Sequence, residues 1–149
     1  MKKLILLLFV GMASLQNYAQ NQYLKKGLAT EGYDVVAYFE SAKPIEGKKG
    51  ITTKYNGAIY QFSSESNKAL FLKNPTQYVP QFGGYCAYGV SENHTSPTDP
   101  KAFTIVDNKL YLNYNLEVKE LWSKEQEERI KSANENWETL KKQHFLLQK

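Results

Sequence analysis

The residue best suited to chemistry in this chain is Cys86, the only cysteine among 149 residues. It follows the string Gly83-Gly84-Tyr85, and glycines let a backbone turn sharply and expose its N–H groups. Such donors stabilise a thiolate and lower the pKa of a neighbouring thiol below its free value of about 8.5. Cys86 is therefore the candidate catalytic residue, as a redox or nucleophilic thiol. The alternative is a small buried hydrophobe.

Four further side chains are candidates for a pocket around this thiol: Asp34, Tyr38, Tyr85 and His94. His94 lies in a polar segment eight residues after Cys86. The His94 side chain has three possible roles: a base for the thiol, a second metal ligand or a solvated loop side chain. Asp34 lies in an apolar, aromatic string, where a carboxylate must be hydrogen-bonded, so it either caps a turn or points into the Cys86 site. Tyr38 and Tyr85 either line the pocket or pack in the core.

Composition narrows the class of protein. Lys and Arg number 19 against 15 Asp and Glu, and loss of Lys2 and Lys3 with a leader would reduce 19 to 17, leaving +2. That charge is too small to indicate nucleic acid as a partner. A single cysteine excludes an intramolecular disulfide and a four-cysteine zinc site. The residue types admit a metal ion or a small molecule as partner, without specifying a metal, a cofactor or an oligomeric state.

Residues 1–20 have the anatomy of a secretory signal peptide. Two lysines precede the apolar run Leu4–Ala13, and a more polar stretch with the small residue Ala19 follows. A membrane-spanning helix needs about 20 apolar residues, so this run is too short for stable insertion. We expect cleavage near Ala19 or Gln20 and an exported protein, periplasmic or extracellular.

Two β-hairpins are predicted from turn residues. Asn56-Gly57 lies between Thr52–Tyr55 and Ala58–Phe62, and both residues tolerate the positive φ of a type I′ turn. Asp107-Asn108 lies between two further alternating segments, which predicts the second hairpin.

Helix signals follow each hairpin. Ser63 and Ser64 are N-cap candidates for a short helix that Asn74-Pro75 ends, and Pro75 suits the first turn of another helix. Asn115 begins a helical tail, in which Ser123 and Gln126 resemble a capping box for a second helix. The apolar positions of that second helix recur every three or four residues: Ile130, Ala133, Trp137 and Leu140.

Three segments show no helical period. Residues 21–32 are expected to be extended, Tyr33–Phe39 to form a strand or a short buried turn, and Val79–Val90 to be irregular. The pattern predicts a small single α+β domain of two β-hairpins with short helices and a longer C-terminal helix. Its expected divisions are a core at 28–117 and a helical segment at 118–145 that packs on it.

Several strings carry a family resemblance. Tyr60-Gln-Phe62-Ser-Ser64, Phe71 and Asn74-Pro75-x-x-Tyr78 resemble the YHS domain. Over roughly residues 32–140 the chain is similar to exported YHS-domain proteins, some of which carry selenocysteine. The remaining matching strings are Gly32–Phe39, Pro80–Ala87, Asp99-Pro100 and Leu110–Asn115. The resemblance places the selenocysteine position of those relatives on Cys86, which implies a functional thiol there.

One departure from that family concerns metal binding. In its metal-trafficking branch, cysteines flank the Phe-x-Ser segment, whereas this chain has Ser63 and Asn67 at those positions. The soft thiolate ligands for copper or zinc are therefore missing by that route. The resemblance implies an exported YHS-domain protein of unassigned reaction that uses Cys86 in redox or ligand chemistry. The alternatives are a non-catalytic metal- or small-molecule-binding module and a structural interaction domain.

Overall fold

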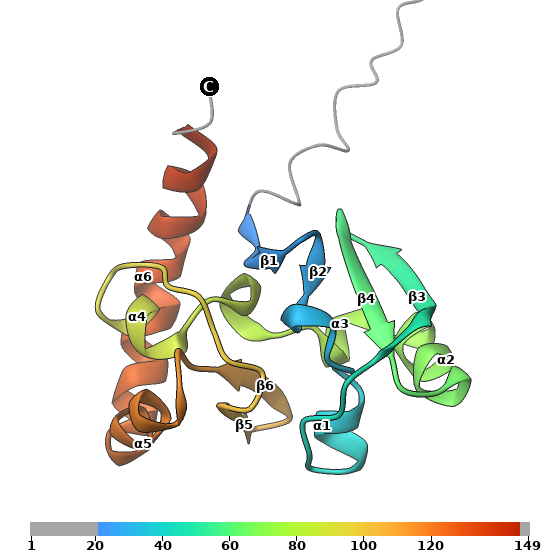
Figure 1. The fold of residues 1–149 in the computed structure, drawn as a ribbon. Coiled ribbons are helices and arrows are strands. Elements are labelled where there is room, and N and C mark those ends of the chain that lie inside the picture. The colour runs from blue at the N-terminus through green and yellow to red at the C-terminus, as the bar shows by residue number, and fades with distance from the viewer. Residues whose placement is uncertain (1–20, 147–149) are drawn as a thin grey trace, which may run out of the picture.

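The fold is α+β, as the sequence predicts, and is seen in a computed structural model that describes residues 21–146. The predicted signal peptide lies outside the described residues. Figure 1 shows a half built on a four-stranded sheet beside a half built on helices. Within the described residues, no helix combines the length and apolarity needed to cross a membrane.

The larger sheet organises the first half of the molecule. Its strands are β1 (Leu24–Lys25), β2 (Leu28–Ala29), β3 (Lys48–Tyr55) and β4 (Ala58–Phe62), in the spatial order β1-β2-β4-β3. The hairpin between β3 and β4 is confirmed, and Asn56 and Gly57 adopt φ values of 47° and 79°. Strand β2 pairs with β4 in parallel, a long-range contact that links the N-terminal segment to this hairpin.

The N-terminal segment is not simply extended. Lys26 and Gly27 have φ values of 53° and 80° and form a tight turn between β1 and β2. A second left-handed turn follows at Thr30–Gly32. The expectation missed the first turn because lysine is not a residue that signals positive φ.

Three helices complete the sheet half. Helix α1 (Ala37–Glu40) replaces the strand considered for Tyr33–Phe39, because Asp34 hydrogen-bonds the backbone that begins it. Helices α2 (Glu65–Lys73) and α3 (Pro75–Tyr78) are as predicted. Ser64 Oγ caps α2 by accepting a 3.1 Å hydrogen bond from Asn67 N.

The second hairpin joins the two halves. Strands β5 (Phe103–Val106) and β6 (Lys109–Leu112) confirm the turn predicted at Asp107-Asn108. Along β6, Leu110 and Leu112 pack in the core of the sheet half, whereas Tyr111 packs in the core of the helical half. The two-residue alternation of a strand therefore serves two cores at once.

The helical half contains α4 (Ala87–Ser91), α5 (Leu116–Lys124) and α6 (Gln126–Leu146). Asn115 caps α5 as predicted, but Ser123 Oγ donates to Lys119 O inside α5 instead of capping α6. In α6, Ala133 and Leu140 are buried, while Trp137 is partly buried. The fully buried tryptophan is Trp122 of α5.

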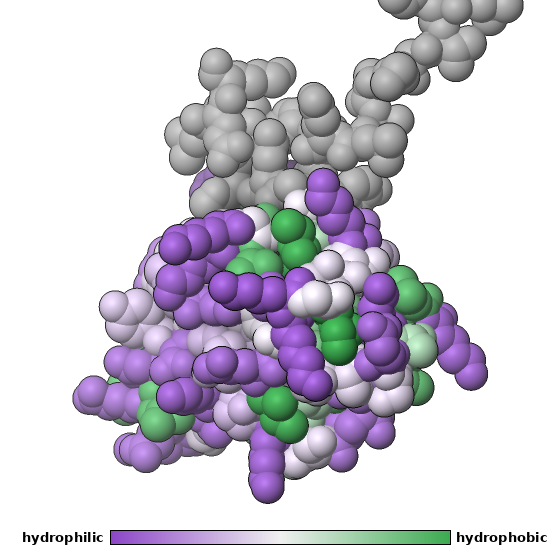
Figure 2. Space-filling model, turned by 45° about the vertical axis from the view of Figure 1, so that its right-hand side comes forward, coloured by the Kyte–Doolittle hydropathy of each residue, from purple (hydrophilic) through white to green (hydrophobic). Residues whose placement is uncertain are grey.

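The surface is mainly hydrophilic on the face drawn in Figure 2, where hydrophobic side chains form small separate groups. Among the described residues, the exposed large hydrophobic side chains are Leu70, Leu72, Tyr114, Leu116 and Leu121. Leu70 and Leu72 belong to α2, whereas Leu116 and Leu121 belong to α5 and Tyr114 lies just before it.

Candidate functional site

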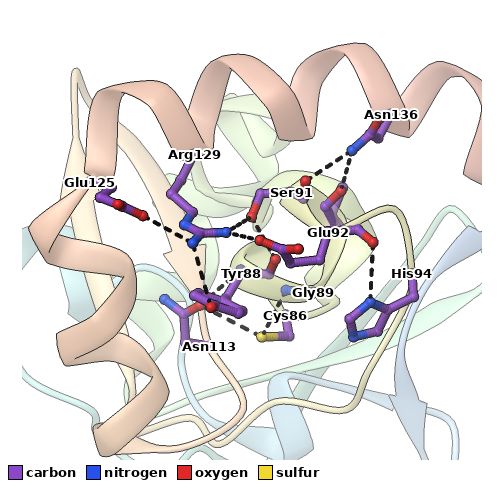
Figure 3. A network of polar contacts seen from close by, with 11 residues as sticks. Cys86, Tyr88, Gly89, Ser91, Glu92, His94, Asn113, Glu125, Arg129 and Asn136 are labelled. Carbon is purple, nitrogen blue, oxygen red and sulfur yellow. Dashed lines mark hydrogen bonds and ion pairs between the residues drawn. The ribbon is translucent and has the colours of Figure 1, made fainter.

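Cys86 is buried at the start of α4, with 2% of its surface exposed. Its Sγ accepts hydrogen bonds from Gly89 N at 3.5 Å and from Tyr114 N at 3.3 Å. It donates to Asn113 Oδ1 at 3.6 Å (Figure 3). The thiol is thus the N-cap of a short helix and also a link to the segment that follows β6.

Burial raises the pKa of the Cys86 thiol, although the N–H groups of Gly89, Tyr114 and Tyr88 act in the opposite direction. Desolvation penalises the charged thiolate more than these dipoles stabilise it. The expectation of a lowered pKa is therefore wrong in direction. N–H donors do reach the sulfur, but they come from α4 and Tyr114 and not from the preceding glycines.

The glycines before Cys86 have another role. A Cβ atom at Gly83 would lie 2.0 Å from Asn21 O, and Tyr23 N donates to Gly83 O at 2.9 Å. Gly83 also has a φ of 61°, which disfavours any side chain. This residue therefore lets the N-terminal segment approach the turn closely.

The predicted pocket residues do not share one site. Tyr38 is buried, donates to Pro100 O at 2.8 Å and packs on Phe103 with ring centroids 4.8 Å apart. Tyr85 donates to Gln22 O at 3.4 Å. Burial raises the pKa of both phenols.

His94 is exposed near the far end of α4. Its Nδ1 lies 3.5 Å from Glu92 O, and its ring lies against Gly89, where a Cβ atom would be 3.2 Å from His94 Nε2. The hydrogen bonds of the Cys86 thiol are with Gly89, Asn113 and Tyr114 instead. Figure 3 shows His94 directed at its own loop.

Arg129 of α6 holds α4 in place, a contact that the sequence did not indicate. Its guanidinium binds Glu92 and Glu125 and lies over the Tyr88 ring, 4.2 Å from the centroid. About two turns further along α6, Asn136 Nδ2 donates to Val90 O at 2.9 Å (Figure 3). These contacts fix the short helix that carries Cys86.

Asp34 forms a separate polar centre in the sheet half and is fully buried. Its Oδ1 accepts from Val36 N at 2.9 Å and Ala37 N at 3.3 Å. Its Oδ2 accepts from Ser63 N at 2.8 Å, Ser63 Oγ at 2.6 Å and Asn67 Nδ2 at 2.8 Å. Asp34 therefore caps the turn that leads into α1, which is one of its two interpretations, and ties that turn to the start of α2.

This centre does not fit a metal ion. Ser63 and Asn67 stand at the positions where the resemblance to the metal-trafficking branch of the YHS family implies cysteines, and both donate hydrogen bonds to the Asp34 carboxylate. A cation there would have to displace donors that already satisfy the carboxylate oxygens. In the part of the chain that the structure describes, no cluster of three or more His, Cys, Asp or Glu residues could hold a metal.

A cavity of about 250 Å³ lies beside the sheet, and sequence analysis did not predict it. Tyr23, Tyr55 and Tyr60 line it, together with Val79 and Pro80. Tyr60 is 2% exposed, and burial raises the pKa of its phenol. Burial, together with a 3.0 Å hydrogen bond to Glu31, raises the pKa of Tyr23 to about 12.

Left-handed backbone surrounds this cavity. Thr30, Asn56, Gly83 and Gly84 all line it and have positive φ values, of 49°, 47°, 61° and 82°. Positive φ is a genuine outlier for a β-branched residue such as Thr30. Phe82, next to Gly83, also has a φ of 54°. Three turns from distant parts of the chain thus converge on one cavity.

Comparison with known proteins gives one family match. No curated protein and no solved structure matches the chain. The matched segment begins at the residue before α1 and ends at Phe82. It contains β3, β4 and part of the cavity lining, including Tyr55 and Tyr60, but it ends before Cys86. That segment, residues 36–82, matches the family model of the YHS domain.

Proposed function

We propose that this protein is an exported, non-catalytic binding module for a small molecule, which occupies the cavity lined by Tyr23, Tyr55 and Tyr60. Concave sites with aromatic walls and a few polar groups are the usual form of small-molecule sites. The volume of about 250 Å³ suits a ligand of about one ring.

The strained backbone at the cavity carries this proposal. A non-glycine residue in a sparsely populated conformation costs about 1–3 kcal/mol, and such residues cluster at ligand clamps. Thr30 lines the cavity, and Phe82 adjoins Gly83, which also lines it. Two strained turns, about fifty residues apart in sequence, thus bound a single concavity.

A set of one-ring probes tests the binding function. Phenol, benzamide, benzoate and benzamidinium are each titrated into the protein at millimolar concentration, with ligand-observed NMR as the readout. At least one probe should bind, and Thr76→Trp should abolish that binding because Thr76 lines the cavity and is exposed at its rim. Lys73→Trp, an exposed position outside the lining, is the control. If no probe binds, the proposed function is wrong.

A second candidate function is thiol chemistry at Cys86. It is supported by the Gly89 and Tyr114 N–H groups, which direct their dipoles at the sulfur. The test is the pH dependence of iodoacetamide alkylation in the folded protein. A midpoint below the free-thiol pKa of about 8.5 supports a functional thiolate. Reaction only at the rate of global unfolding makes Cys86 a structural residue.

Export is proposed from the leader pattern of residues 1–20 alone. The intact mass of the protein secreted or held in the periplasm of its native host should begin near Gln20 or Asn21. A full-length mass in that fraction would rule out the cleaved leader.

A further inference from the structure

We propose that the ligand of the cavity is an uncharged ring compound with a polar substituent that hydrogen-bonds the Tyr60 hydroxyl. This inference rests on the proposed function and assigns it a chemical class. Three properties of the lining lead to it: its charge, its aromatic faces and its one buried hydroxyl without a partner.

The lining carries no ionisable acid or base of the Asp, Glu, Lys, Arg or His type among the described residues. Its polar members are tyrosines, threonines, Gln22 and Asn56. A charged ligand would lose its hydration without gaining an opposite charge, which is costly in a partly enclosed site. The cavity therefore favours a neutral molecule.

The aromatic walls favour a ring. The Tyr55 and Tyr60 rings have centroids 6.4 Å apart and planes inclined at 68°, an edge-to-face arrangement. Tyr23 lines the same cavity, with Pro80 among the apolar members. Aromatic rings prefer offset or edge-to-face contact with another ring. A planar ring in this cavity can therefore pack against the tyrosine rings that line it.

The Tyr60 hydroxyl supplies the polar contact. No hydrogen bond joins it to another described residue, although Tyr60 is only 2% exposed and lines the cavity. Three other hydroxyls of the lining have partners, those of Tyr23, Thr30 and Thr76. Tyr55 is only partly buried, so Tyr60 is the buried tyrosine of the lining whose hydroxyl has no partner among the described residues. A buried tyrosine hydroxyl usually finds a partner, and here a ligand group would provide it.

This hydroxyl is a donor over the whole physiological range. Burial raises the pKa of Tyr60, so the phenol remains protonated. The matching ligand group is thus an acceptor such as a carbonyl or amide oxygen. Benzamide has this group on a single ring and serves as the neutral probe.

The experiment compares three probes of nearly equal shape. Benzamide is neutral, benzoate anionic and benzamidinium cationic, and their Kd values are measured by protein-observed NMR. Benzamide should bind at least about 10-fold more tightly than either ion. Tyr60→Phe should weaken benzamide about 3- to 10-fold, the value of one hydrogen bond. Tyr38→Phe, a buried tyrosine outside the lining, should leave benzamide binding unchanged.

The outcomes separate the inference from the function on which it rests. If benzoate or benzamidinium binds the cavity more tightly than benzamide, the inference that the ligand is uncharged is wrong, while the proposed binding function stands. Equal benzamide affinity of Tyr60→Phe and the parent protein overturns the role of the hydroxyl. Binding of none of the probes, with all variants folded, rejects the cavity function itself.

Discussion

Asp34 and Cys86 are two buried polar residues at the starts of short helices, yet their surroundings differ. Asp34, in the sheet half, accepts five hydrogen bonds from backbone and side-chain donors. Cys86, in the helical half, accepts two N–H groups and donates one weak bond to Asn113. Both residues join separate segments of the chain, but the carboxylate does so through five hydrogen bonds and the thiol through weaker bonds to Asn113 and Tyr114.

The difference follows from charge. A buried carboxylate must be saturated with donors, and charge-assisted hydrogen bonds are about twice as strong as neutral ones. A thiol is a weak donor and a weak acceptor that packs like a small hydrophobe. The helical half is therefore stabilised mainly by other groups, notably the Arg129 contacts with α4 and the buried Trp122.

The largest expected effect is at Asp34. Asp34→Asn removes the charge and turns an NH₂ group toward Ser63 and Asn67, which are themselves donors. We expect a loss of about 3 kcal/mol or more in the free energy of unfolding. The measurement is urea denaturation followed by tryptophan fluorescence. Asp99→Asn is the control, because Asp99 Oδ1 accepts from Lys101 N in a turn and its change should cost below about 1 kcal/mol.

A smaller effect is expected at Cys86. Cys86→Ala removes the cap of α4 and should lower the free energy of unfolding by about 1–2 kcal/mol. Cys86→Ser retains a capping atom and should lose less. If Cys86→Ala is as destabilising as Asp34→Asn in the same urea experiment, the contrast between the two centres does not hold.

The smallest effect is a pH dependence that belongs to the thiol. Burial raises the pKa of Cys86 above its free value of about 8.5, so the folded protein holds the proton more tightly than the unfolded chain. Its contribution to stability is complete below that free value and is lost as the pH rises through the raised pKa. Between about pH 8 and pH 10, the parent protein should lose more stability than Cys86→Ala. Parallel curves would show that the thiol titrates alike in both states.

Tyrosines do not disturb this comparison. Burial raises the pKa of Tyr23, Tyr38 and Tyr60, so these phenols also destabilise the folded state at high pH. They are present in both proteins, and their contribution cancels in the difference. The difference in stability between the parent protein and Cys86→Ala is therefore clearest below about pH 10, where free tyrosine begins to titrate.

Local residues were sufficient to predict much of the fold. Asn56-Gly57 and Asp107-Asn108 have the backbone freedom that tight hairpins need, and both turns are present. Ser64 and Asn115 cap helices as their side chains suggest. These features depend on residues within four positions of each other, so their physics can be read from the chain itself.

Long-range contacts decided the candidate sites. Asp34 meets Ser63 and Asn67 across 29 and 33 residues, and the sequence alone does not specify which donors surround a buried carboxylate. The glycines before Cys86 predict a lowered thiol pKa, but the sequence does not reveal the burial that outweighs N–H donation and raises it.

The sequence by itself thus determined the hairpins, most helix starts and the candidate thiol, because turn and cap preferences act over a few residues. The tertiary structure alone decided the burial of Cys86, the donors of Asp34 and the cavity. That cavity forms where the turns at Thr30, Asn56 and Gly83 meet, although they are about 25 residues apart in sequence. Their meeting depends on the parallel pairing of β2 with β4 and on the approach of Tyr23 to Gly83. Neither contact leaves a periodic signal in the chain, because each joins single residues from separate segments.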